Sequence, residues 1–452
     1  RLVGSEMCIR DSFIIYKNRL MMQINVAFCN RPLYDNPLGG DAIQMLETKK
    51  WLESLYGFHI SVITDPKELT DDFDIVHIFN FSTYEITNRF MEKAHQLGIP
   101  IVSSCIYWDY SYSIPPLHYF FGYPSHIRKS CVLFYRFLYG NITAFLRRPR
   151  TVSWEFRKHV RKFIDYSSFV LPNSLEEGIL LYDFARMKNM NKLRVVYNGV
   201  ELKENQILSS EIFFSKYKLP RNYILQVGRI VYLKNQLNLI YALRNHSDIP
   251  IVFIGQISDF KYGRKLHAIA QERGNVFFLD KVPHDEIASF YHYANLHVLL
   301  SLRESPGLVS MEAASQGCPI VISTSEYLPK ETYFSKAPYV VDPLDISAIE
   351  RTLLQAYQER KVFDLNIKDF SWSNVAVQTC KVYEEIMNNM RKQDQYLSEY
   401  ATKDSEAIRL KEEDKDIRPS YFRDIDRIIY SLSYTRYIDK TQVFSNISND
   451  HI

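Results

Sequence analysis

The chain has 452 residues, which is too long for one ordinary hydrophobic core and predicts two domains with additional segments. Hydrophobic residues make up 46% of the sequence and charged residues 24%, which is the composition of a folded protein with large buried cores. The net charge of +3 does not indicate nucleic acid as a partner, because electrostatic steering by a whole surface needs a concentrated field of one sign.

The cysteines and the apolar runs exclude two further classes of protein. The six cysteines are scattered without a C-x-x-C pair, so the sequence predicts neither a disulfide scaffold nor a zinc site and favours a reducing cytoplasm. The best candidate for a membrane span, residues 131–145, is interrupted by Arg136. We therefore expect a cytoplasmic protein that can touch a membrane without spanning it.

Residues 1–21 form a leader ahead of the first predicted strand. This leader lacks the apolar core and the small-residue cleavage site of a secretory signal. Residues 7–11 are similar to the translated end of a transposon used to prepare sequencing libraries, which predicts an artefactual leader; a disordered natural N-terminus is the alternative. In either case Met21 or Met22 is the expected start, because the first strand pattern begins at Ile24.

Short β-rich apolar runs alternate with longer amphipathic stretches from residue 22 to residue 388, which is typical of parallel sheets covered by helices. An Asn-Gly turn and polar residues at 195–206 predict a linker, so the expected domains are residues 22–200 and 201–388. The prediction is an α/β protein with two Rossmann-like, doubly wound domains facing each other across a cleft. Ligands of such sheets bind at the carboxyl ends of the strands. The predicted strands are 24–29, 59–64, 75–80, 99–104 and 169–174 in the first half, and 223–228, 250–255, 276–280, 296–301, 319–324 and 339–342 in the second.

The loop after the first strand of the second half carries two cations. A nucleotide diphosphate-sugar needs cations or backbone N–H groups for its phosphates, carboxylates for its hydroxyls, and glycine where the backbone approaches closely. Arg229 and Lys234 follow the strand that ends at Gly228, so one loop can offer two cations to a diphosphate. Two solvated surface cations are the alternative.

Two glutamates and a glycine follow the predicted strand 296–301. Glu304 and Glu312 are separated by seven residues, and both carboxylates can reach one ligand if Glu304 lies in a loop and Glu312 begins a helix. Gly307 permits a tight backbone between them, and the N–H groups of Leu308 and Val309 can point at anionic oxygen near a helix start. An ordinary helix entry with acidic residues favoured by the dipole is the alternative.

The segment 304–312, with EAASQGCPIVIS from Glu312 onward, resembles the Glu-x7-Glu signature of glycosyltransferase family 4, also called glycosyltransferase group 1, which has the GT-B fold. Six further motifs match this family in the right order, so the resemblance covers about residues 22–388 and is more specific than any single motif. They are Gly39-Gly40, DIVH at 74–77, PNS at 172–174, YNGV at 197–200, the loop from Gly228 to Lys234, and the closing helix at 370–386.

The resemblance implies a metal-independent glycosyltransferase that retains the anomeric configuration of the donor sugar. Arg229 and Lys234 would hold the donor diphosphate and stabilise the leaving nucleotide, a role that a metal fills elsewhere, so no metal or other cofactor is expected. Glu304 would lie against the sugar and Glu312 against the ribose. A saccharide or lipid-linked acceptor, as in surface polysaccharide synthesis, would be held mainly by the first half. The other donor-binding candidates are Gly39, Gly40, Gly228, Asn198, Gly307, Leu308 and Val309.

The sequence departs from the family pattern at two places. Many members have Gly-Phe-Gly after the first glutamate, where this chain has Ser305-Pro306-Gly307. A histidine that many carry after the fourth strand is replaced by Tyr107, Trp108 or Asp109. Asp109 is a candidate acceptor contact, and its alternative is a structural turn residue. His77 is a second candidate, because it is expected at a strand end facing the cleft; its alternative is a core histidine. These departures leave open a catalytically inactive nucleotide-sugar-binding module.

A basic and aromatic segment lies in the first half. Between Arg128 and Lys162 there are ten Lys or Arg residues and one acid, Glu155, interleaved with aromatic residues. This combination suits contact with an anionic membrane near a lipid-linked acceptor. RNA binding is a weaker alternative, because no RNA motif accompanies the charge, and amphipathic helices with a solvated basic face are an equal one.

Residues 389–452 form a charged, helical C-terminal extension. From about residue 390 it resembles the N-terminal region of HD-domain deoxyguanosine-triphosphate triphosphohydrolases, with RDIDRI at 423–428 and KTQVF at 440–444. The metal ligands of that family would lie beyond Ile452, so the sequence given does not encode hydrolase chemistry. We expect a chimeric or truncated gene prediction, with a helical extension packed on the transferase as the alternative.

Overall fold

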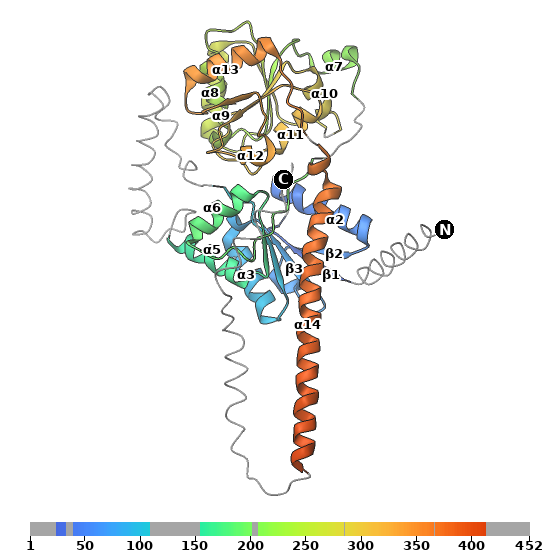
Figure 1. The fold of residues 1–452 in the computed structure, drawn as a ribbon. Helices are drawn as coiled ribbons and strands as arrows, with labels where there is room; N and C mark the ends of the chain where they lie inside the picture. Colours follow the sequence, from blue (N-terminus) through green and yellow to red (C-terminus); the bar gives the residue numbers. More distant parts are fainter. Residues whose placement is uncertain are drawn as a thin grey trace, which may run out of the picture. The chain divides into compact units, whose positions relative to one another are not determined.

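The computed structural model describes residues 24–32, 39–108, 154–200, 207–283, 285–365 and 367–412 (Figure 1). Asp109, the leader, the basic segment before residue 154 and the tail after residue 412 lie outside these ranges, so the predictions for them stay predictions. Residues up to Ile386 belong to one compact unit, and residues 387–452 to a second. The first unit holds both predicted sheets.

The first sheet is parallel and has the strand order β2-β1-β3-β4-β5. Its middle strands β3 and β4 are buried along their whole length, because helices cover both faces and leave room only for apolar runs. The strands are β1 (Asn25–Cys29), β2 (His59–Ile63), β3 (Ile75–Phe79), β4 (Ile101–Ser104) and β5 (Phe169–Leu171).

Helices pack on both faces of the first sheet (Figure 1). One face carries α3, α5 and α6, whose apolar residues share a core with alternate residues of β1, β3 and β4. The helices are α2 (Gly40–Tyr56), α3 (Tyr84–Gln96), α5 (Trp154–Tyr166) and α6 (Leu175–Ala185), with short 3₁₀ turns η1 (Pro66–Glu68) and η2 (Phe81–Thr83).

Helix α5 is the described part of the basic and aromatic segment. Phe156 is only 3% exposed and joins Val160 and Phe163 in the core. The opposite face exposes Lys158 and Arg161. Phe156 is therefore not available to a membrane boundary, because helical periodicity turns the apolar side chains inward. This part of the segment is an amphipathic helix with a basic outer face.

The second sheet is also parallel, in the order β11-β10-β9-β6-β7-β8. Alternate residues of its strands enter two separate cores, so Ile224 and Leu225 point to opposite faces. One core is shared with α8, α9 and α13, and the other with α7, α10, α11 and α12 (Figure 1). The strands are β6 (Ile224–Val227), β7 (Ile251–Ile254), β8 (Val276–Leu279), β9 (Leu296–Leu299), β10 (Ile320–Ser323) and β11 (Tyr339–Val341).

Every strand predicted from the sequence is confirmed with one to three fewer residues. Helices of the second half precede, connect and follow the strands of the second sheet. The helices are α7 (Ser210–Tyr217), η5 (Tyr232–Lys234), α8 (Gln236–Ala242), α9 (Phe260–Arg273), α10 (Ile287–Tyr293), α11 (Leu308–Ser315), α12 (Lys330–Tyr333), α13 (Ile346–Glu359), η6 (Ile367–Phe370) and α14 (Trp372–Glu412). None of the helices in the described ranges has the length and apolar character needed to cross a bilayer.

The first turns of α14 return to the first sheet. The Tyr383 hydroxyl lies 2.6 Å from Nδ1 of His77 in β3, and its ring packs edge-on against Phe58. Arg194 forms an ion pair with Glu385 at 2.6 Å. The sequence predicts residues up to 388 in the second domain, whereas Tyr383 and Glu385 contact residues of the first half.

Candidate active site

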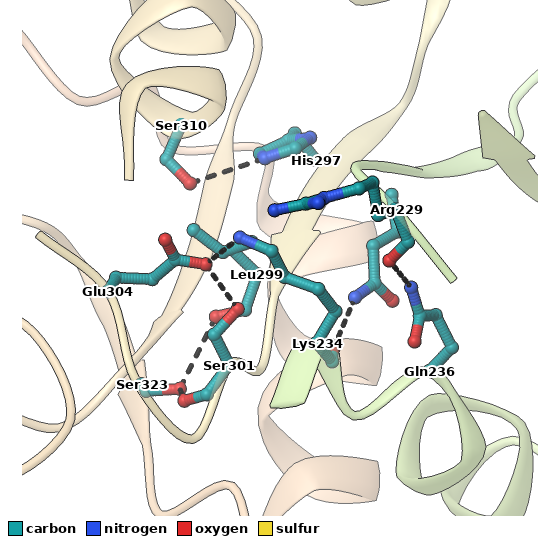
Figure 2. Close-up of polar contacts among 10 residues, drawn as sticks. Arg229, Lys234, Gln236, His297, Leu299, Ser301, Glu304, Ser310 and Ser323 are labelled. Atoms are coloured by element: carbon teal, nitrogen blue, oxygen red, sulfur yellow. Dashed lines mark hydrogen bonds and ion pairs between the residues drawn. The ribbon is translucent and has the colours of Figure 1, made fainter. Parts of the chain in front are cut away.

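The carboxyl ends of the neighbouring strands β6 and β9 bring a cation and a carboxylate together. The Nζ atom of Lys234 forms an ion pair with the Glu304 carboxylate, which also accepts a hydrogen bond of 2.6 Å from the Ser301 hydroxyl (Figure 2). The side chains of Lys234 and Glu304 are 24% and 11% exposed, so the pair is shielded but still reaches the surface. Two residues predicted to share one ligand are therefore in direct contact.

Backbone hydrogen bonds hold the two loops that carry this pair. The Gln226 side chain donates to the carbonyl of Lys234 at 2.7 Å, and the Leu302 N–H donates to the carbonyl of Leu233 at 2.8 Å. The Glu304 N–H donates to the carbonyl of Tyr327 at 2.8 Å. The loops after β6 and β9 are therefore fixed to each other.

Arg229 supplies a second cation beside the pair. Its carbonyl accepts a hydrogen bond of 3.0 Å from Gln236, which fixes the backbone (Figure 2). Figure 2 shows the guanidinium extending toward the side of the loop where Lys234 and Glu304 meet. The side chain is exposed, so it is available to an anion that reaches this edge of the sheet.

Two glycines allow the ends of β6 and β7 to lie against each other. Gly228 and Gly255 have φ angles of +140° and +147°, which favour glycine. A Cβ atom on Gly255 would lie 2.2 Å from the carbonyl oxygen of Gly228, so a side chain there would push away the backbone that precedes Arg229. Gly228 was predicted to be a site residue, whereas Gly255 was not.

Helix α11 begins at Leu308, ahead of Glu312. Gly307 has a φ of +95° and caps the helix, so Leu308 and Val309 are its first two residues. Glu312 is the fifth of its eight residues rather than the first, and its carboxylate accepts a hydrogen bond of 2.9 Å from the Tyr291 hydroxyl. The condition that Glu312 begins a helix is therefore not met, whereas Leu308 and Val309 do lie at the helix start, directly after the left-handed glycine.

The two predicted glycines of the first half lie at the start of α2. Gly39 is the N-cap and Gly40 is the first residue of the helix. A Cβ atom on Gly39 would lie 2.6 Å from Oδ1 of Asp41, whereas Gly40 faces open space. Asp41 itself pairs with Arg31 at 3.5 Å and accepts from Asn80 at 3.0 Å, so the first turn already holds a carboxylate.

His77 and Asn198 are both buried and hydrogen-bonded. His77 is 1% exposed in the middle of β3 rather than at its end, and Ser104 lies 2.9 Å from its Nε2 while Tyr383 contacts its Nδ1. Burial lowers the pKa of His77 to about 3. These contacts favour the core alternative for His77. Asn198 donates to the side chain of Gln44 at 3.2 Å and is 2% exposed.

Two of the three residues at the place of the family histidine make internal contacts. The Tyr107 N–H donates to the Glu177 carboxylate at 2.7 Å, and the Trp108 indole donates to the carbonyl of Glu326 at 3.1 Å. Sequence analysis did not single out Glu177. Its local signal was readable, since Ser174 and Glu177 have capping-box spacing and the Ser174 hydroxyl accepts from the Glu177 N–H.

The carboxyl group of Glu177 has a raised pKa. Burial raises the pKa of its carboxyl to about 7, although hydrogen bonds from Tyr107, Ser305 and Asn173 lower it, and the nearby Glu176 raises it further. A folded-state pKa above the ordinary 4.5 means that Glu177 contributes stability at low pH, which is lost as the pH rises through about 7.

We therefore expect Glu177→Gln to flatten the dependence of the free energy of unfolding on pH. In the unmodified protein the contribution of Glu177 falls by on the order of 3 kcal/mol across this window, at about 1.4 kcal/mol per pKa unit. Urea unfolding of both proteins between about pH 5 and about pH 8 measures the difference in slope. Parallel curves for the two proteins would contradict the assignment.

In the described part of the chain, no group of three or more His, Cys, Asp or Glu side chains is arranged to hold a metal ion.

A family model and curated relatives that match this chain are all glycosyltransferases. Residues 209–366 match the family model of glycosyl transferases group 1. The chain is 24% identical to O-antigen chain mannosyltransferase B of Escherichia coli, over 54% of this chain and 83% of that protein. It is 22% identical to the capsular polysaccharide biosynthesis glycosyltransferase CapH of Staphylococcus aureus, over 73% of this chain and 92% of that protein.

Solved structures agree on the fold. HepE of Anabaena, in complex with UDP-glucose, has a TM-score of 0.59 at 14% identity, covering 80% of this chain and all of that one. Sucrose-phosphate synthase of Thermosynechococcus elongatus has a TM-score of 0.57 at 16% identity, covering 81% of this chain and all of that one. The predicted arrangement of two Rossmann-like domains is confirmed.

Proposed function

Because the chain belongs to the group 1 glycosyltransferases with the GT-B fold, we propose that it transfers a sugar from a nucleoside diphosphate-sugar to a saccharide or lipid-linked acceptor and retains the anomeric configuration. The observation that carries the proposal is the ion pair of Lys234 and Glu304 at the strand ends, with Arg229 beside it. The names of the O-antigen and capsular relatives support surface polysaccharide synthesis as the setting.

The charges of this site suit a donor diphosphate. Glu304 balances Lys234 before the donor arrives, so the pair costs less to keep in a shielded place than either charge alone. When a diphosphate approaches, Lys234 and Arg229 can donate hydrogen bonds to its oxygens and stabilise the negative charge that grows on the leaving nucleotide. The N–H groups of Leu308 and Val309 at the start of α11 add donors for anionic oxygen.

The carboxylate of Glu304 suits the sugar. Ser301 fixes one of its oxygens, which leaves acceptor capacity for sugar hydroxyls once Lys234 turns to the phosphates. The Glu312 carboxylate already accepts a hydrogen bond from Tyr291, so a contact with a ribose would be made beside that bond.

A transfer assay tests the proposal directly. Purified protein is offered UDP-glucose, GDP-mannose and other nucleotide sugars with saccharide and lipid-linked acceptors, and the anomeric configuration of the product is read by NMR. We expect one donor to give a product with the configuration of that donor. An inverted product would contradict retention, and a failure of every donor to react would favour the inactive binding module. A thermal-shift screen selects donors first, since a ligand at a hundred times its Kd stabilises by about 2.7 kcal/mol.

Membrane contact of the first half is a further part of the proposal. The basic face of α5 includes the exposed Lys158 and Arg161, so we expect binding to anionic vesicles at low salt. Reversing both charges with Lys158→Glu and Arg161→Glu should weaken co-sedimentation at least about tenfold, at about 1 kcal/mol per basic residue. The same reversal at Lys218 and Lys336, both exposed in the second half, is the control. Equal binding by the two variants would rule out a role for α5.

A further inference from the structure

Two consecutive glutamates at the start of α6 hold elements of the second half. Glu176 accepts hydrogen bonds from the N–H and hydroxyl of Thr332 at 3.0 and 2.5 Å. Glu177 accepts a hydrogen bond of 2.7 Å from the Ser305 hydroxyl. Thr332 belongs to α12, and Ser305 is the residue after Glu304. The first half therefore contacts the loop that carries a predicted donor ligand.

Glu177 is held firmly in the first half. Its carboxylate is 0% exposed and accepts from two backbone N–H groups, those of Tyr107 at 2.7 Å and Asn173 at 3.0 Å. Both belong to segments that follow neighbouring strands of the first sheet, β4 and β5. A buried carboxylate bound in this way has little freedom, so it gives Ser305 a fixed partner.

Buried side chains surround this contact and complete a network between the halves. The Asn173 side chain accepts from Gln44 at 2.8 Å, and its carbonyl accepts from the Tyr333 hydroxyl at 2.6 Å. The Tyr333 hydroxyl in turn accepts from the Asn198 N–H at 2.8 Å. All four residues are at most 3% exposed, so water does not compete for these hydrogen bonds.

The position of Ser305 gives the contact a consequence for the site. Adjacent Cα atoms are separated by only about 3.8 Å, so fixing Ser305 also restricts Glu304. The Glu304 N–H is bound to Tyr327, and the neighbouring carbonyl of Glu326 accepts from Trp108. A glycine at position 305, as many relatives of this family pattern have, could not donate to Glu177. Ser305, which departs from the family pattern, and the buried Glu177 are therefore the two partners of one hydrogen bond.

We propose that Glu177 is a positioning residue for sugar transfer, which holds the Glu304 carboxylate in place against the donor sugar by binding the Ser305 hydroxyl. The inference rests on the proposed function for the identity of the reaction, while the contact itself is independent of it. Glu177 touches neither donor nor acceptor in this role. Its effect reaches the reaction through the backbone between Ser305 and Glu304.

The first test compares Ser305→Ala with Ser305→Thr, which restores a hydroxyl. We expect Ser305→Ala to lower kcat/KM for the donor about tenfold, the equivalent of one lost hydrogen bond, with the acceptor KM unchanged. Ser305→Thr should recover most of this loss. Ser209→Ala is the matched control, because it removes the hydroxyl that caps α7 in the second half and should lower only the stability. If Ser305→Ala had the same kcat/KM for the donor as the unmodified protein, the proposal would be overturned, even if the melting temperature of the variant were lower.

The second test needs no substrate. Hydrogen exchange of the peptide that contains Glu304 should be faster in Ser305→Ala and in Glu177→Gln than in the unmodified protein, Ser305→Thr and Ser209→Ala. Equal exchange in all five proteins would also overturn the proposal. If the unmodified protein transferred no sugar, the proposed function would fail, whereas the exchange comparison would still decide whether Glu177 holds the loop.

Discussion

Lys234→Ala should lower kcat/KM for sugar transfer by about 10²- to 10³-fold, which is the usual effect of removing one preorganised group that stabilises transition-state charge. The ammonium group is the cation nearest to Glu304, and its loss also leaves that shielded carboxylate without its ion-pair partner. Steady-state kinetics with the donor found in the screen measure the effect. Lys336→Ala, an exposed lysine of the same half, is the matched control and should retain full activity.

A variant of Glu304, the ion-pair partner of Lys234, tests whether the two residues act on one ligand or independently. Glu304→Ala should also abolish most of the activity, and the double variant should lose little more than either single variant, because contacting residues that act as a unit are not additive. A double variant whose loss equals the product of the two single losses would contradict a common ligand. Full activity in Lys234→Ala would remove the basis of the proposed donor site.

Gly255→Ala should disrupt both the fold and the donor loop. The new Cβ atom would lie 2.2 Å from the carbonyl oxygen of Gly228, and the φ of +147° is unfavourable for alanine. We expect the free energy of unfolding to fall by on the order of 2–5 kcal/mol, as the sum of overpacking and backbone strain. The shift of the segment before Arg229 should also weaken donor binding in the protein that remains folded.

Gly274→Ala is the control for backbone strain alone. Gly274 has a φ of +77°, and a Cβ atom there would meet nothing within 4 Å. Denaturant unfolding should show a loss of about 1–3 kcal/mol with unchanged donor affinity. If Gly255→Ala and Gly274→Ala lost the same stability and had the same donor affinity, the contact between the ends of β6 and β7 would not be needed for donor binding.

The sequence was sufficient to predict the two sheets, because buried parallel strands read as short apolar runs. The ends of the strands were predicted less well, since small residues such as Gly228 and Ser301 directly follow the apolar runs but already lie in loops. The position of Glu312 in α11 was a condition that the sequence could not decide. Gly307, in the left-handed conformation, caps the helix and Leu308 begins it, so Glu312 lies in the middle of the helix.

The site was predicted in part. Lys234 and Glu304 were found through local motifs, and the structure shows them in contact. The partner of Glu177 lies 128 residues away in the sequence, so the capping-box spacing at Ser174 could identify a helix start but not a contact with Ser305. His77 looked like a candidate because a histidine in an apolar strand carries no sign of the tyrosine that will cover it, which comes 306 residues later.

The return of α14 to the first sheet determines where the chain can be divided. Residues 24–200 expressed alone would uncover Phe58 and His77, because the side chain of Tyr383 that covers them would be missing. A peptide that begins at Trp372 and extends through Ile386 should therefore bind such a fragment in trans and restore its cooperative unfolding. We therefore expect the first half to unfold cooperatively only when residues 372–386 accompany residues 24–200, and a cut at the linker alone should yield an incomplete product.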